Sequence, residues 1–314
     1  MRQVPNLSLL SYVQGSNLDK QKFVDNLFTG IKDYGFIVLT DHTVDEKAMH
    51  KGYELLNEFF SLPENIKMKY HKEGGGGQRG YTPFGQEHAK NNPHPDLKEF
   101  WHVGRSFPAN SMSKFSNIYP ENVWPSEIKE FKSVFTLLYE SLDKTSELLL
   151  DALGTALDVP QSYFREMIKD GNSILRPIHY PPIPEKGFEN SVRSAAHEDI
   201  NLITILMGAT DSGLQLLDRD GKWLDVNSKM GQLVVDSGDV LSRICNDVIP
   251  STTHRVINTP EGKERSRYSM PFFVHPNTDV QMTCIPSCVG SGKKYEDIPY
   301  AKFFEQRLKD IGLY

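Results

Sequence analysis

The sequence predicts a mostly β-sheet protein with flanking helices, in which a double-stranded β-helix (jelly-roll) core follows an α/β N-terminal cap. Two observations predict this fold class. Short apolar runs separated by turn residues recur between residues 173 and 274, a pattern typical of a β-sandwich or jelly roll. Apolar residues recur at helical spacing over much of the first 60 residues, and a long helical pattern follows residue 125.

The bulk composition excludes several classes of protein. The 314 residues are 38% hydrophobic and 24% charged, which suits one large domain or two tightly joined ones. The net charge is −6 and no run of five like charges occurs, so neither nucleic acid nor an anionic membrane is expected as a partner. The N-terminus lacks a signal-peptide pattern, and no segment approaches the roughly 18 consecutive apolar residues of a membrane span.

The cysteines indicate a reducing compartment. Cys245, Cys284 and Cys288 form an odd and sparse set, which fits the cytoplasm better than a disulfide framework. Cys284 and Cys288 lack the second pair that a zinc site requires, so two ordinary thiols are the favoured interpretation. We therefore expect a cytoplasmic protein, and the sequence carries no signal for its oligomeric state.

The first 70 residues alternate between strand and helix patterns. Apolar spacing and flanking residues predict a strand at Leu7–Val13, a helix at Leu18–Asp33, a strand at Phe36–Leu39 and a helix at Asp45–Phe60. The run Gly74–Gly77 that follows has no backbone preference. It is not a phosphate-binding loop, because no Gly-Lys-Ser/Thr follows it and no helix begins there.

The remaining helices are predicted from apolar stripes and capping residues. A long helix is expected after Trp124 and Pro125, with Ser126 as its cap. A short helix is expected at residues 160–169 and a final one at residues 299–308.

The predicted strands of the core are joined by clear turn signals. A strand region covers residues 173–182, and Asp218–Gly221 is a tight hairpin signal between two further strands. Residues 232–235 are apolar enough for a buried strand, and the turn at Gly238 and Asp239 is expected to lead into another. Residues 258–263 form the hairpin that connects the strands beginning at His254 and Arg267.

One constellation of polar residues lies within these strands. His197 and Asp199 are two positions apart, so a strand presents both side chains on one face. His254 opens a second predicted strand. Two imidazoles and one carboxylate can occupy one face of a metal ion and leave three positions open, which is the arrangement of non-haem Fe(II) oxygenases. A pair of His and Asp alone is weak support, because most such pairs are surface or hydrogen-bonding residues.

A second pattern follows the third candidate ligand. Arg267 and Ser269 are again two positions apart, within an apolar strand. A guanidinium with an adjacent hydroxyl can receive a carboxylate. The alternative is a surface arginine on an edge strand, which does not explain why the pair lies inside an apolar strand just past His254.

Together, His197-x-Asp199, His254 and Arg267-x-Ser269 resemble the 2-oxoglutarate/Fe(II) dioxygenase superfamily. The closer similarity is to the branch with isopenicillin N synthase and the plant flavonoid, gibberellin and ethylene-forming oxidases, as a bacterial-type member. The resemblance implies that the first three residues hold Fe(II), while Arg267 and Ser269 bind the distal carboxylate of the cosubstrate 2-oxoglutarate. O2 is then used to hydroxylate, desaturate or cyclise a small organic molecule, with release of succinate and CO2.

The resemblance extends to further site residues. Family members carry an Asn-Tyr-Tyr-Pro-Pro-like stretch, whose second tyrosine donates to the cosubstrate carboxylate. Aligned on Pro181 and Pro182, that tyrosine is Tyr180, whereas Ile178 and His179 depart from the pattern. Arg176 is a candidate second anion receptor, for the cosubstrate or for an acidic substrate. Its alternative is a salt bridge at the rim of the barrel.

By the same resemblance, the Gly-Tyr segment that contains Tyr81 lies near the substrate entrance, and residues 96–103 form the first barrel strand. Tyr81, His179 and Phe273 are candidate substrate contacts, although such aromatic residues suit a packed core equally well. The expected domains are an N-terminal cap at residues 1–95 and a core at 96–280 that includes a backing helix near 125–155. A helical tail follows at 281–314.

Two alternatives stay open on the sequence alone. An oxidase similar to isopenicillin N synthase would use Fe(II) and O2 without 2-oxoglutarate, and its Arg and Ser would serve another anion. A non-catalytic jelly-roll binding protein is less favoured, because all three metal ligands are present. Structural zinc is disfavoured too, because such sites are usually closed by four ligands. The primary substrate is not encoded in any pattern that we can identify.

Overall fold

The computed structural model describes residues 4–72, 78–88, 94–183, 186, 188, 191–226, 228–260 and 262–310. The Gly74–Gly77 run lies outside these residues. Within them, no helix is long and apolar enough to cross a lipid bilayer.

Two facing β-sheets form the core. The larger sheet has the strand order β1-β2-β11-β8-β13-β5-β4-β3, with β6 paired to both β13 and β4. Its strands are β1 Asn6–Ser8, β2 Phe36–Thr40, β3 Gly80–Thr82, β4 Glu99–Gly104, β5 Ile174–Leu175, β6 Ile178–Tyr180, β8 Ile203–Met207, β11 Leu233–Ser237 and β13 Arg267–Val274. The smaller sheet has the order β10-β9-β12-β7, with β10 Trp223–Asp225, β9 Leu214–Leu217, β12 His254–Val256 and β7 Ser194–His197.

Helices and short strands complete the described part of the chain. The helices are α1 Leu9–Gln14, α2 Asn17–Tyr34, α3 Glu46–Phe60, α4 Glu64–Lys67, α5 Phe131–Ala156, α6 Tyr163–Ile168, α7 Asp239–Ile244 and α8 Tyr300–Asp310. Short 3-10 turns are η1 Met68–Tyr70, η2 Lys114–Asn117 and η3 Pro286–Cys288, and β14 Gln281–Met282 pairs with β15 Ile298–Pro299.

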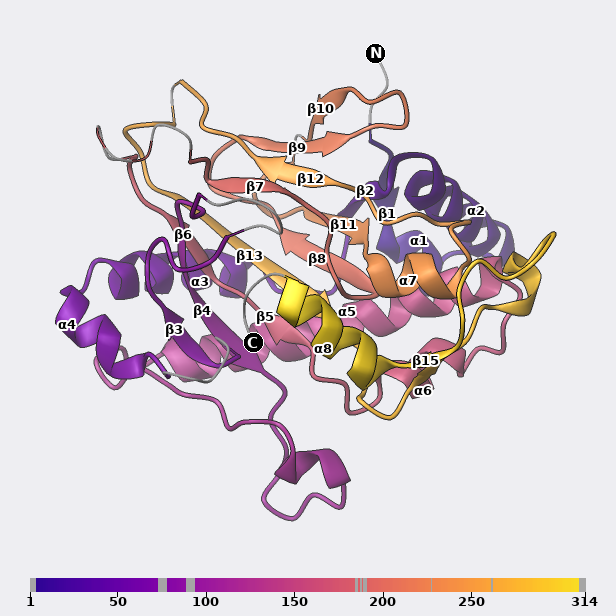
Figure 1. Ribbon diagram of the computed structural model, residues 1–314, viewed down its shortest axis with the longest axis horizontal. Helices are drawn as coiled ribbons and strands as arrows, with labels where there is room; N and C mark the ends of the chain where they lie inside the picture. The colour runs from indigo at the N-terminus through magenta and orange to yellow at the C-terminus, as the bar shows by residue number, and fades with distance from the viewer. Residues whose placement is uncertain are drawn as a thin grey trace.

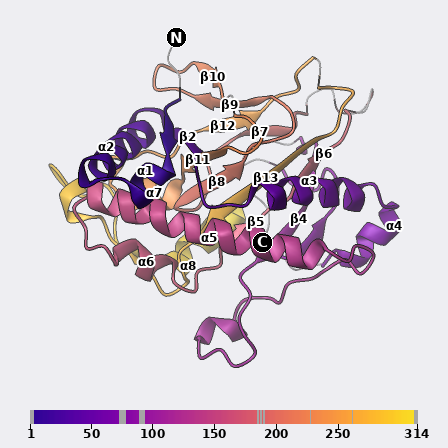
Figure 2. The ribbon, with the colours of Figure 1, turned by 180° about the vertical axis from the view of Figure 1, so that it is seen from behind.

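The smaller sheet lies above the larger one in Figure 1, and α5 runs across the outer face of the larger sheet when seen from behind in Figure 2. Helix α5 contacts β13, β8 and β4. It does so through an apolar stripe at helical spacing in which Phe131, Phe135, Leu138 and Leu142 are fully buried. The two facing sheets with flanking helices confirm the predicted fold class.

The end of α2 sets the entry of the N-terminal region into the larger sheet. Gly35 ends the helix in the left-handed conformation with φ of 77°, and its N–H donates to the carbonyl of Ile31. A side chain here would collide with Thr252, because a Cβ would lie 1.5 Å from the Thr252 hydroxyl. The reversal at Gly35 lets β2 pair with β11, so Phe36 lies opposite Asp236.

Four local predictions were wrong. The strands on either side of residues 258–263 do not form a hairpin, because β12 lies in the smaller sheet and β13 in the larger one. The strand expected at Leu7–Val13 ends at Ser8 and continues as α1, where Tyr12 stacks on Phe23 of α2. The long helix begins at Phe131 rather than at Ser126, whose N–H instead bonds the hydroxyl of Tyr70. The strand expected after Gly238 is α7, because short apolar runs do not distinguish strand from helix.

The expected domain boundary at residue 95 stays a prediction. Strands from before it, β2 and β3, pair with β11 and β4 from after it. The cap and the core therefore share one hydrogen-bonded sheet. The three cysteines are free and buried.

Candidate metal centre

Strand pairing brings the three candidate metal ligands together. His197 is the last residue of β7 and His254 is the first residue of β12, and these two residues face each other in the antiparallel register. Their rings are 4.3 Å apart between centroids. Asp199 lies two positions after His197 and past the end of β7, so the strand predicted to carry both residues ends at the first of them. The members of the cluster are up to 57 positions apart in the sequence.

The ligand atoms are close enough to share one ion. Asp199 Oδ1 lies 3.7 Å from His197 Nε2 and 3.9 Å from His254 Nε2. One ligand atom from each residue lies within 4.8 Å of the other two. Among the residues described, no second group of His, Cys, Asp or Glu meets this criterion. Two imidazoles and one carboxylate on one side of a site fit the donor set of non-haem Fe(II).

Backbone carbonyls orient both imidazoles. His197 Nδ1 lies 2.8 Å from the carbonyl of Ala195, and His254 Nδ1 lies 3.2 Å from the carbonyl of Thr252. A carbonyl only accepts, so each Nδ1 carries the proton and each Nε2 keeps its lone pair for a metal. Burial, followed by the neighbouring His254, lowers the pKa of His197 to about 4. His197 is therefore a neutral ligand at neutral pH.

Thr204 on β8 holds the carboxylate of Asp199 in place. Its hydroxyl donates to Asp199 Oδ2 and accepts a hydrogen bond of 2.8 Å from Asn201 Nδ2. Burial alone would raise the pKa of Asp199, but the two imidazoles and this hydroxyl outweigh it and lower that pKa. The bond occupies Oδ2 and leaves Oδ1 directed at the two imidazoles.

Replacing Thr204 with valine is expected to weaken Fe(II) binding roughly 10- to 100-fold, the usual effect of losing a partner of a metal ligand. Thr204→Ser keeps the hydroxyl and is expected to bind Fe(II) as the wild type does. Competition with a coloured chelator under argon measures both affinities. Equal affinity in the valine variant would show that the hydroxyl does not position Asp199.

Two cavities meet at the ligand cluster. The inner one, of about 60 Å³, is lined by all three candidate ligands together with Arg267, Ser269 and Tyr180, among others. The outer one, of about 380 Å³, is lined by His197 and Asp199. Both cavities therefore reach the same two ligand residues.

Arg267 lies at the wall of the inner cavity. It is 1% exposed, its Nε donates to the carbonyl of Asp211 at 3.1 Å, and its Nη1 is buried without a hydrogen-bond partner. Ser269 is two positions further along β13, and Tyr180 of β6 is the register partner of Arg267. The guanidinium carbon lies 5.0 Å from the centroid of the Tyr180 ring. The predicted pair and Tyr180 thus face one small enclosed space.

Arg176 is held rigidly between the two cavities and lines both. Its Nε donates to His102 Nε2 at 2.5 Å, and its Nη1 lies 3.2 Å from Glu87. Its guanidinium carbon lies 4.4 Å from the ring of Phe100 and 5.1 Å from that of Phe273. The salt bridge expected as an alternative is therefore present, and it fixes the arginine in the wall of both cavities.

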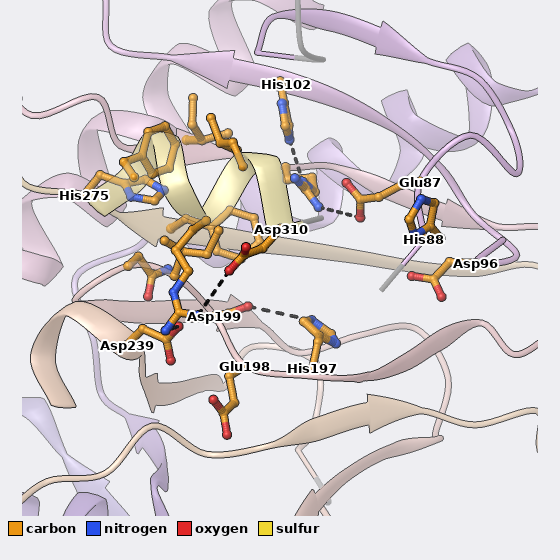
Figure 3. A pocket seen from close by; sticks show the side chains of 18 of the residues that line it. Glu87, His88, Asp96, His102, His197, Glu198, Asp199, Asp239, His275 and Asp310 are labelled. Carbon is orange, nitrogen blue, oxygen red and sulfur yellow. Dashed lines mark hydrogen bonds and ion pairs between the residues drawn. The ribbon is translucent and has the colours of Figure 1, made fainter. Parts of the chain in front are cut away.

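Sequence reasoning missed several residues of the outer cavity. Lys98 lines both cavities, and its Nζ lies 2.8 Å from Glu87 and 2.9 Å from Asp96. Burial alone would raise the pKa of Glu87, but Arg176 and Lys98 outweigh it and hold that pKa well below its usual value. Figure 3 shows His197 and Asp199 on one side of the cavity and Glu87 and His102 on another. No linear spacing connects these residues.

Helix α8 forms a further wall of the outer cavity and was predicted only as a tail helix. Phe304 and Arg307 of this helix line the cavity. Arg307 Nη2 pairs with Asp239 Oδ2 at 3.1 Å, and the N–H of Asp239 donates to the carbonyl of Asp199 at 2.7 Å. The tail of the chain is thereby connected to the backbone of a candidate ligand.

Tyr81 and His179 do not belong to the described residues that line either cavity. Tyr81 donates to Glu99 at 2.5 Å, and His179 Nδ1 lies 2.8 Å from the same carboxylate. Lys67 completes this buried network with an ion pair of 2.7 Å. The network joins α4, β3, β4 and β6, which favours a structural task for the two residues. Phe273, in contrast, lines both cavities.

His275, another cavity residue, gives the fold a measurable pH dependence. Burial lowers its pKa to about 4, while the unfolded chain has the ordinary value near 6.5. As the pH falls below about 6.5, the unfolded chain binds a proton that the fold excludes, so stability is lost down to about pH 4.

Between pH 7 and pH 5, the metal-free wild type is expected to lose about 2 kcal/mol more unfolding free energy than His275→Asn. Asparagine retains an acceptor for the Tyr300 hydroxyl, which lies 2.7 Å from His275 Nδ1. Urea unfolding at both pH values measures the difference. Parallel pH curves for the two proteins would contradict it.

Comparisons with known proteins agree with this geometry. A family model described as the N-terminal region of non-haem dioxygenases in morphine synthesis matches residues 4–127, and one of the 2OG-Fe(II) oxygenase superfamily matches residues 171–276. The 2-oxoglutarate-Fe(II) type oxidoreductase hxnY of Emericella nidulans is 31% identical, over 88% of this chain and 80% of its own length.

Solved structures extend the likeness to nearly the whole chain. A 2OG-Fe(II) oxygenase family protein from Caulobacter crescentus is 40% identical and superposes with a TM-score of 0.87. The superposition covers 99% of this chain and 100% of the Caulobacter crescentus chain. A Neurospora crassa protein solved in complex with alpha-KG is 27% identical, with a TM-score of 0.86 and coverage of 98% and 95%.

The resemblance found in the sequence is thus confirmed. The chain belongs to the 2OG-Fe(II) oxygenase superfamily, and it is a non-haem iron enzyme that uses Fe(II), 2-oxoglutarate and O2 to oxidise a small organic molecule.

Proposed function

We propose that His197, Asp199 and His254 hold the iron, that the inner cavity takes 2-oxoglutarate and that the outer cavity takes the primary substrate. The observation that supports this division is the meeting of the two cavities at His197 and Asp199. The inner cavity is small and has the buried cation Arg267 in its wall. The outer one has room for a small molecule beside the same ligands.

The donor set supports Fe(II) as the metal. Two imidazoles, each with its Nδ1 directed at a carbonyl, and one carboxylate suit this ion and leave positions open for other ligands. When bound, the iron supplies the oxidation of the substrate by O2, coupled to the decarboxylation of 2-oxoglutarate to succinate and CO2.

In this proposal the chain's own residues bind, orient and exclude water. Arg267 offers its unpartnered Nη1 to the distal carboxylate of the cosubstrate, and Ser269 and Tyr180 offer hydroxyls in the wall of the same cavity. All three side chains are at most 3% exposed, so water does not compete for the carboxylate. The binding energy of this distant group fixes the reacting end of the cosubstrate at the metal.

Arg176 and Phe273 would orient the primary substrate. Both line the outer cavity, and Arg176 is immobilised by Glu87, His102 and two aromatic rings. A fixed guanidinium suits a substrate that carries a carbonyl or carboxylate near the oxidised carbon. The Neurospora crassa protein has also been solved with thymine and with 5-formyluracil, which are small carbonyl-bearing molecules. We propose hydroxylation, desaturation or ring closure of a molecule of comparable size.

We also propose a cytoplasmic location, since free thiols and Fe(II) both require reducing conditions.

The test is the visible absorption of Fe(II)-loaded protein under argon, before and after addition of 2-oxoglutarate. A weak charge-transfer band that requires both is expected, because it arises when the 2-oxo acid chelates the metal. A substrate screen scored by succinate release follows from that result. Iron binding without the band, together with O2 consumption without succinate, would favour the oxidase alternative and reassign Arg267 and Ser269 to a substrate carboxylate.

A further inference from the structure

We infer that Arg193 is a positioning residue for the cosubstrate, which sets the affinity for its distal carboxylate by acting through Arg267 and the loop that leads from β12 to β13. This inference rests on the proposed role of Arg267. Arg193 is not one of the described residues that line the inner cavity, so its action is indirect.

Arg193 connects β7, which ends at the candidate ligand His197, to the loop that precedes Arg267. It lies immediately before β7 and is 0% exposed. Its Nη2 donates to the carbonyls of Gly262 and Arg265, both at 2.7 Å. Its backbone N–H donates to Asn258 Oδ1 at 3.0 Å. One buried side chain therefore fixes the turn from which β13 begins.

The corner around Arg193 holds an unusual number of unpartnered polar atoms. Arg193 Nε and Nη1, Arg267 Nη1 and Asp211 Oδ2 are all buried without a hydrogen-bond partner. A Cβ on Gly262 would lie 3.3 Å from Arg193 Nη1 and 3.4 Å from Asp211 Oδ2, so these two atoms border the same narrow gap. Buried polar groups are normally paired, and such a group of exceptions indicates a place that a ligand or water completes.

The charges in this corner favour an anion. Asp211 lies beside both guanidinium groups, because its carbonyl accepts from Arg267 Nε at 3.1 Å and its Oδ2 borders the same gap at Gly262 as Arg193 Nη1. Burial, followed by the positive charge of Arg267, lowers the pKa of Arg193. Asp211 is the carboxylate that opposes this charge, and it also lies 3.7 Å from Arg265. Among the described residues, Arg193, Arg265 and Arg267 bring positive charge to Asp211, and the distal carboxylate of a 2-oxo diacid at Arg267 would offset part of it.

A purely structural role for Arg193 makes a different prediction. If Arg193 only stabilised the fold as a whole, its loss would weaken the binding of every 2-oxo acid by a similar factor. If it positions Arg267 and adds positive charge there, its loss weakens the binding only of acids that carry the distal carboxylate. The pair 2-oxoglutarate and 2-oxovalerate separates these cases, because the two have equal chain length and the second has a methyl group in place of that carboxylate.

The experiment measures the Kd of both acids by calorimetry on the whole, Fe(II)-loaded protein under argon. Arg193→Met is expected to weaken the binding of 2-oxoglutarate roughly 10-fold, the scale of losing one nearby charge in a buried site, and to leave the Kd of 2-oxovalerate within about twofold. Asp211→Asn removes the opposing negative charge. It is expected to lower the Kd of 2-oxoglutarate about two- to threefold and to leave that of 2-oxovalerate unchanged. This second variant keeps the test decisive if Arg193→Met does not fold.

Arg105→Met is the matched control. Arg105 is a largely buried arginine paired with Asp143 at 2.8 Å, and it is outside the described lining of either cavity. Its loss is expected to leave the ratio of the two Kd values unchanged.

The inference would be overturned if Arg193→Met raised the Kd of both acids by the same factor, or if Asp211→Asn did not lower the Kd of 2-oxoglutarate. Arg267→Met is measured alongside. If Arg267→Met also leaves the ratio of the two Kd values unchanged, the proposed binding of 2-oxoglutarate at Arg267 fails as well. A changed ratio in Arg267→Met with none in Arg193→Met overturns the inference alone.

Discussion

Replacing His254 with alanine is expected to abolish iron-dependent turnover, with a larger loss than the roughly 100-fold that removal of an outer partner causes. The variant keeps His197 and Asp199 but loses the imidazole that β12 contributes across the register. Two ligands remain in place of three, so we expect a lower affinity for Fe(II) and a less defined orientation of the bound cosubstrate. Iron content after anaerobic loading and succinate release measure the two effects.

The matched control is His179→Gln, which removes another buried imidazole. His179 belongs to the network around Glu99 and is outside the described lining of both cavities, so its loss is expected to lower stability and to leave iron content unchanged. Because His254 also packs edge-on against Phe36 at 5.7 Å, unfolding of both variants is measured in parallel. Full turnover in a folded His254→Ala protein would remove His254 from the ligand set.

Replacing Arg267 with methionine is expected to raise the Kd for 2-oxoglutarate by ~100-fold, because truncating one partner of a buried charge pair costs about 3 kcal/mol. The side chain is 1% exposed and fixed through Nε to the carbonyl of Asp211, so neither water nor a neighbour can replace it. Fe(II) affinity is expected to be unchanged, because Arg267 is not a ligand. The Kd for the acid and the Kd for the metal are measured separately.

Arg267→Lys separates charge from shape. Lysine keeps the positive charge but loses the planar fork that pairs with a carboxylate through two donors. An intermediate Kd is expected, closer to that of Arg267→Met than to that of the wild type. Wild-type affinity for 2-oxoglutarate in the methionine variant would transfer the proposed role to another cation, such as Arg176.

The strand repeat placed Arg267 with Ser269, because residues two positions apart share a face in any strand and both lie in β13. The same argument was applied to His197 and Asp199, but β7 ends at His197 and Asp199 lies beyond it. The carboxylate of Asp199 is held instead by the hydroxyl of Thr204. The partnership with His254 is different, because it depends on an antiparallel register that no local rule specifies. There the resemblance to a family supplied what periodicity could not.

Helix and strand assignments failed where the local pattern was short. Residues Leu9–Gln14 and Asp239–Ile244 are six-residue helices, and an apolar run of that length suits either structure. Tertiary contacts decide these cases. Helix α1 packs against α2 through Tyr12, and α7 is fixed at its start by the bond from Asp239 to the carbonyl of Asp199.

The lining of the cavities was decided only by the tertiary structure. Strand β4 is buried on both faces, so hydropathy cannot say which side faces the cavity. In the fold, Lys98 and His102 line the outer cavity, whereas Glu99 of the opposite face closes the network with Tyr81 and His179. The order of polar and apolar residues determined by itself the sheet class, the helical cap and the shared face of Arg267 and Ser269. Register, helix packing and the position of the C-terminal helix decided which charges meet, because electrostatic contacts depend on distances that the chain sets only when it folds.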